Sequence, residues 1–83
     1  MNIYVSNLGF TVDREQLEKF FSPYGIVASV SVILDKLTNR SRGFAFVQMR
    51  DNTAAEKAIR ELNGAILDGR PVRLNEARRN EKY

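Results

Sequence analysis

Hydrophobic and polar residues alternate along the stretch 42–49, which reads RGFAFVQM. In a strand, this alternation collects small and apolar side chains on one face. The opposite face carries Arg42, Phe44 and Phe46. Because the apolar face already supplies a buried side, packing does not require two further phenyl rings. We therefore predict a strand with one core face and one aromatic face.

A second alternating stretch, residues 3–8, reads IYVSNL and places Tyr4 on the face opposite to Ile3 and Val5. In the predicted strand over residues 42–49, Phe44 and Phe46 would lie about 7 Å apart, because a strand rises ~3.3 Å per residue. This separation is close to that of two unstacked bases. The two stretches together predict a platform on which bases could stack.

Two segments follow the period of a helix. Asp13 can cap the first one, with Gln16 completing a capping box. Leu17, Phe20 and Phe21 then recur on one face, so both phenylalanines are expected in the core. Asp51 is the expected cap of the second helix, Asn63-Gly64 is its expected end, and its inner face would carry Ala55, Ala58, Ile59 and Leu62.

The remaining segments favour strands. Residues 26–35 alternate, and residues 36–41 form a connection in which Asn39 suits a left-handed turn. Asp68-Gly69 is expected to turn a short hairpin that leads into the last strand. In the strand over 26–35, the predicted inward residues are Ala28, Val30, Val32 and Leu34, and the outward ones are Ser29, Ser31 and Ile33; in the last strand, Val72 and Leu74 would point inward, and Arg73 and Asn75 outward.

The order of these elements is β-α-β-β-α-β. It predicts an α+β, ferredoxin-like fold, in which a four-stranded antiparallel sheet has two helices on one face. Residues 1–77 would form a single domain, followed by a short polar and basic tail over residues 78–83.

Composition narrows the possible chemistry. The chain of 83 residues leaves little room for an internal catalytic cavity. It has no cysteine and no histidine, so we expect neither a metal site nor a cofactor. Basic residues exceed acidic ones by three and gather in two places, a loop with Lys36, Arg40 and Arg42 and a carboxyl end with Arg70, Arg73, Arg78 and Arg79. With no signal peptide or long apolar run, a cytoplasmic location is expected.

The two alternating stretches resemble the octamer and hexamer of the RNA recognition motif (RRM) family, whose octamer reads K/R-G-F/Y-G/A-F-V-x-F/Y. Every octamer position fits except the last, where Met49 replaces an aromatic residue. By alternation, Met49 faces the core, where a flexible thioether can fill the same space. The chain is most similar to short, single-RRM proteins of bacteria and cyanobacteria, with plant glycine-rich RNA-binding proteins further off.

The resemblance implies a non-enzymatic protein that binds single-stranded RNA, or single-stranded DNA, as a monomer and without a membrane. Tyr4 and Phe44 would each stack on a base, Phe46 would pack between sugars or against a base, and Arg42 would bridge to a phosphate. The other candidate binding residues are Asn75, Ala77 and Arg78, which lead out of the last strand together with Glu76, and Ser31, Ile33, Lys36, Arg40 and Arg73, which flank the platform. Members of this kind are associated with post-transcriptional regulation or RNA remodelling.

Two alternatives stay open. The aromatic face could bind a protein partner or a second copy of the chain. An enzyme on the same topology, such as an acylphosphatase-like protein, would need an anion-binding loop with a nearby Arg and Asn. The turn over residues 6–11, SNLGFT, offers no Gly-rich or Arg-bearing cradle for an anion.

Overall fold

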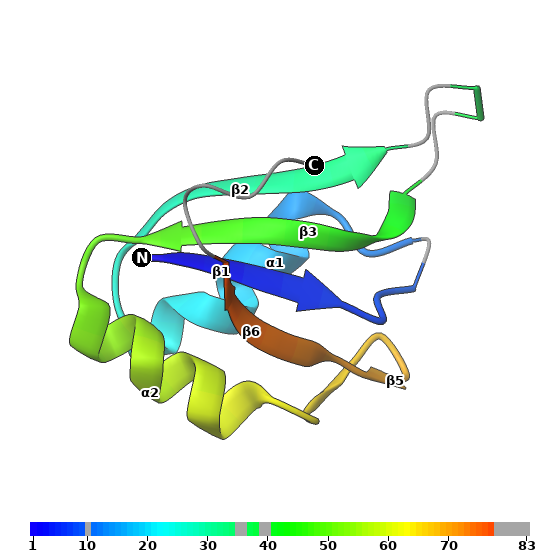
Figure 1. Cartoon of the computed structure of the whole chain (residues 1–83). Helices are drawn as coiled ribbons and strands as arrows, with labels where there is room; N and C mark the ends of the chain where they lie inside the picture. Colours follow the sequence, from blue (N-terminus) through cyan, green and yellow to red (C-terminus); the bar gives the residue numbers. More distant parts are fainter. Residues whose placement is uncertain (10, 35–36, 39–40, 78–83) are drawn as a thin grey trace.

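The computed structural model describes residues 1–9, 11–34, 37–38 and 41–77, without the side chains of residues 41 and 42. Its four-stranded sheet has the order β2-β3-β1-β6, and every neighbouring pair is antiparallel. Both helices lie on the same face of this sheet, which confirms the predicted fold class (Figure 1). The elements are β1 (Asn2–Ser6), α1 (Arg14–Phe21), the 3-10 turn η1 (Ser22–Tyr24), β2 (Val27–Leu34), β3 (Ser41–Met49), α2 (Asn52–Leu62), β4 (Ile66–Leu67), β5 (Arg70–Pro71) and β6 (Arg73–Ala77).

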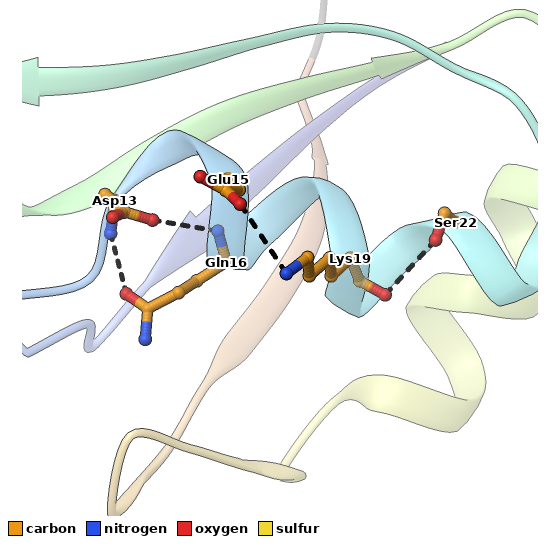
Figure 2. A network of polar contacts seen from close by, with 5 residues as sticks. All are labelled: Asp13, Glu15, Gln16, Lys19 and Ser22. Atoms are coloured by element: carbon orange, nitrogen blue, oxygen red, sulfur yellow. Dashed lines mark hydrogen bonds and ion pairs between the residues drawn. The ribbon is translucent and has the colours of Figure 1, made fainter.

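Side-chain caps start both helices. The Asp13 carboxylate accepts a hydrogen bond from the Gln16 backbone N–H at 2.8 Å, and the Gln16 side chain accepts one from the Asp13 N–H at 3.0 Å (Figure 2). This is the predicted capping box. Asp51 caps α2 by accepting from the N–H groups of Thr53 and Ala54. In the described part of the chain, no helix is long and apolar enough to cross a membrane.

The core lies between the helices and the inner face of the sheet. Met49 is fully buried there, as the alternation of β3 predicts, and so is Phe21. Phe20 is half-buried and packs at the margin of the same cluster. The cluster takes Leu17 and Phe21 from α1, Ala55, Ala58 and Leu62 from α2, Leu8 and Val12 from the connection between β1 and α1, and Ile3, Val5, Val30, Ala45, Val47, Met49, Val72 and Leu74 from the sheet and the segment before β6.

The prediction for residues 26–35 was partly wrong. Ala28 is exposed, because the register of β2 against β3 shifts between Val27 and Ser29. A bulge adds a residue to one strand, so the alternation on either side of it is out of phase. A second shift precedes Leu34, which is exposed and is therefore not part of the core, contrary to the prediction.

The turns that the sequence predicts after α2 are present. Gly64 has a φ of +88°, the left-handed conformation expected where a helix ends. Asp68 and Gly69 both have positive φ and join β4 to β5, as an Asp-Gly hairpin turn requires. The left-handed turn predicted at Asn39 lies outside the described residues.

η1 packs closely against α2. The Tyr24 hydroxyl lies 3.3 Å from a Glu61 carboxylate oxygen. The pKa of Tyr24 is raised, mainly because the hydroxyl is partly desolvated and secondly because the Glu61 carboxylate is close. A Cβ added to Gly25 would lie 2.8 Å from the Cβ of Ala54 and 3.3 Å from the Met49 Cε. The absence of a side chain at Gly25 thus allows this close approach.

Gly25→Ala is therefore expected to reduce the free energy of unfolding by about 1–3 kcal/mol, because overpacking forces neighbours to shift. Urea denaturation measures the loss. Gly9→Ala is the control, since its new methyl group would meet its nearest atom at an ordinary 3.6 Å. Equal stability of the two variants would contradict the proposed close contact.

Candidate nucleic-acid interface

Strand register brings the predicted platform residues into rows across the outer face of the sheet. Tyr4 pairs with Phe46 of β3 on one side and with Asn75 of β6 on the other. Ser31 of β2 pairs with Phe46. Directly opposed residues share a face, so Ser31, Phe46, Tyr4 and Asn75 form one row.

A second row lies next to the first. Ser6 pairs with Phe44 on one side and with Arg73 on the other. Arg73 is exposed, and its guanidinium belongs to the same face as the phenyl ring of Phe44. The two rows place the three predicted rings on two central strands, flanked by a serine, an amide and a basic side chain. We call this surface the aromatic face.

The three rings of the aromatic face contact one another. Their centroids lie 5.8 Å apart for Tyr4 and Phe44, 5.4 Å for Tyr4 and Phe46, and 6.3 Å for Phe44 and Phe46. The Tyr4 pairs are tilted and the phenylalanine pair is edge-to-face. All three side chains are half-buried, whereas the core residues between them in the sequence, Val5 and Ala45, are fully buried. The rings therefore form a continuous surface on the side of the sheet opposite the helices.

A third row adds amide groups that the sequence analysis did not single out. Asn2 pairs with Gln48, and Gln48 pairs with Ser29. The Ser29 hydroxyl donates to the Gln48 side-chain oxygen at 3.2 Å, and all three residues are exposed. Strand alternation could have predicted that Asn2 and Gln48 share the face of the rings, because Gln48 follows Phe46 by two residues and Asn2 precedes Tyr4 by two.

The residues predicted to lead out of the last strand do not all serve the aromatic face. Asn75 does, and it is exposed. Glu76 pairs with the core residue Ile3, so its carboxylate belongs to the other face of the sheet. Ala77 pairs with Asn2 in the sheet, but it is only 6% exposed and therefore offers little surface to a ligand.

Other predicted site residues are placed less fully. Ile33 is half-buried on β2. Arg42 belongs to β3 by its backbone, but its side chain is outside the described part, as are Lys36, Arg40 and Arg78. Among the described residues, no group of three or more Asp and Glu side chains could hold a metal ion. The described residues of this face thus offer a stacking surface, amide groups and the Arg73 charge.

The chain is similar in sequence to proteins that are named as RNA-binding. The chain is 44% identical to a protein of Nostoc sp. named "Putative RNA-binding protein RbpE", over 99% of its own length and 83% of that protein. It is 48% identical to the chloroplastic RNA-binding protein CP29B of Arabidopsis thaliana, but spans only 26% of that longer protein.

Solved structures of RNA-binding proteins have the same fold as this chain. The crystal structure of RNA binding protein PG1 superposes with a TM-score of 0.92 at 44% identity, covering 99% of both chains. An Sxl-lethal protein/RNA complex has a TM-score of 0.86 at 38% identity, covering 92% of this chain and 47% of that one. A model of the RNA recognition motif matches residues 3–73, which include all three rings of the aromatic face. The chain belongs to the RNA recognition motif family.

Proposed function

We propose that this protein binds single-stranded RNA on its aromatic face. The observation that carries the proposal is the contact between three half-buried rings, at 5.4–6.3 Å, on the side of the sheet opposite the helices. Rings in such a place add little to the core, because the apolar inner face already fills it. The relatives that are named as RNA-binding proteins support the same ligand.

Stacking would supply most of the affinity. A base stacked on an aromatic side chain contributes ~1–3 kcal/mol. Two or three such contacts would approach the ~8 kcal/mol of a micromolar complex. Arg73, exposed beside the second row, would add a phosphate contact.

The amides of the first and third rows would read base edges. Asn2, Gln48 and Asn75 are exposed, and each side chain carries both a donor and an acceptor. Because Ser29 occupies the Gln48 oxygen, the Gln48 NH₂ group remains to donate to a base. Base preference would therefore depend on these amides more than on the rings, whose stacking tolerates every base.

We further propose a role in post-transcriptional regulation or RNA remodelling, supported by the membership of the RRM family. The proposal assigns no catalytic step to any residue. Four further properties stay predictions from the sequence. They are the monomeric state, the cytoplasmic location, the binding of single-stranded DNA, and the division into a domain over residues 1–77 and a tail over residues 78–83.

Phe44→Ala is expected to weaken binding by about 5-fold to 150-fold, the equivalent of ~1–3 kcal/mol of lost stacking. Tyr4→Ala should behave alike. Fluorescence anisotropy with a pool of random single-stranded RNA measures the affinity, and circular dichroism shows whether each variant still folds. The matched control is Phe20→Ala, which removes a half-buried ring from α1, on the other side of the sheet.

The control should retain the wild-type dissociation constant despite any loss of stability. If Phe20→Ala weakened binding as much as Phe44→Ala, the rings would matter only for folding. If wild type bound no RNA at tens of micromolar but bound a polypeptide, the protein-partner alternative would replace RNA binding.

Binding should also weaken with salt, because phosphate contacts release counterions. With about four phosphates neutralised, the logarithm of the binding constant should fall with a slope of about −2.8 against the logarithm of salt concentration. That is a loss of about fiftyfold between about 50 and 200 mM salt. Anisotropy titrations over this range test the estimate, and an affinity independent of salt would exclude phosphate contacts.

A further inference from the structure

Side-chain hydrogen bonds join the β4–β5 hairpin to the end of β1. Arg70 Nη2 donates to Asn7 Oδ1 at 3.0 Å, and Asn7 Nδ2 donates to the Pro71 carbonyl at 2.6 Å. A guanidinium can only donate and a carbonyl can only accept, so the orientation of the Asn7 amide between them is fixed. Asn7 has a φ of +61°, a left-handed conformation that asparagine tolerates better than most residues.

In the described part of the chain, no carboxylate forms an ion pair with the Arg70 guanidinium within 4.0 Å, although the Asp68 carboxylate and the Arg70 Cδ both lie beside Gly9. Among the described residues, the ion pairs within 4.0 Å join only Lys19 to Glu15 and Lys57 to Glu61. Asp68, on the same hairpin, instead accepts a hydrogen bond from the Thr11 hydroxyl at 2.6 Å. Arg70 is exposed, and its remaining N–H groups can bind an anion.

Arg70 lies where the aromatic face ends. Asn7 directly follows Ser6, the residue that pairs with both Phe44 and Arg73. At this end of the sheet, β1 stops, β3 and β6 begin, and β5 lies beside the start of β6 (Figure 1). An RNA strand that crosses the second row from Phe44 to Arg73 would approach the hairpin that carries Arg70.

We propose that Arg70 forms a phosphate-binding subsite beyond the aromatic face, and that Asn7 is its positioning residue. The subsite extends the proposed RNA binding and rests on it. The chemical reason is that a guanidinium matches two phosphate oxygens with parallel N–H groups. The hydrogen bond to Asn7 holds the Arg70 guanidinium in place beforehand, which also lowers the entropy lost when the phosphate binds.

The test uses Arg70→Gln, Asn7→Gly and the matched control Arg60→Gln, which removes the same charge from an exposed position on α2. Anisotropy with a nine-nucleotide random RNA pool is measured across salt concentrations. Arg70→Gln should weaken binding by roughly fivefold at low salt and make the salt slope shallower by about 0.7, the value for one phosphate contact. Arg60→Gln should change neither quantity.

Asn7→Gly separates positioning from charge. Glycine keeps the left-handed backbone but releases the Arg70 side chain. We expect a loss of affinity of about twofold with an unchanged salt slope, because the charge is still present. Thermal unfolding of each variant identifies any loss that comes from a destabilised hairpin.

The outcomes distinguish the subsite from the proposed function. If wild type binds RNA and Phe44→Ala does not, but Arg70→Gln keeps the wild-type affinity and slope, the subsite alone is refuted. Equal losses in Arg70→Gln and Arg60→Gln would also refute it, because net charge would then explain both. If wild type binds no RNA, the proposed function fails together with the subsite.

Discussion

β1 and β3 pair in the register that sets Tyr4 opposite Phe46, and the separation of the two faces depends on that register. Successive side chains of a strand point to opposite faces, so a slip of β1 by one residue would turn Tyr4 into the core and Val5 out of it. Backbone hydrogen bonds hold both ends of the pair. The Leu8 N–H donates to the Gly43 carbonyl at 2.9 Å, and the Met49 N–H donates to the Met1 carbonyl at 3.0 Å.

The same register separates stability from binding. On the inner face, fully buried side chains such as Val5 and Val47 each contribute ~1.5–3 kcal/mol of hydrophobic free energy. On the outer face, the rings are only half-buried and contact one another. A stacked base would bury them further, so apolar surface left exposed in the free protein would favour the complex. Both helices can therefore stabilise the fold without obstructing the aromatic face.

Many features of the fold and of the aromatic face could be predicted from the sequence, because they depend on residues that are close together in the chain. The Asp13 capping box depends on residues three positions apart, and the two faces of β3 depend on simple alternation. The bulge near Ala28 escaped prediction, because an extra residue in one strand leaves no mark in a run of small and apolar residues. The Asn7–Arg70 hydrogen bond joins residues 63 positions apart, so it follows from tertiary packing that no local pattern reveals.

The central claim is that RNA binds the aromatic face and not the helices. Its most direct test is an NMR titration of ¹⁵N-labelled protein with a short single-stranded RNA, following each backbone amide. The structure predicts shifts concentrated in β1, β3 and β6, around Tyr4, Phe44 and Asn75, with the amides of α1 and α2 nearly unchanged. Shifts confined to the outer surfaces of α1 and α2, with the amides of β1 and β3 unmoved, would contradict it.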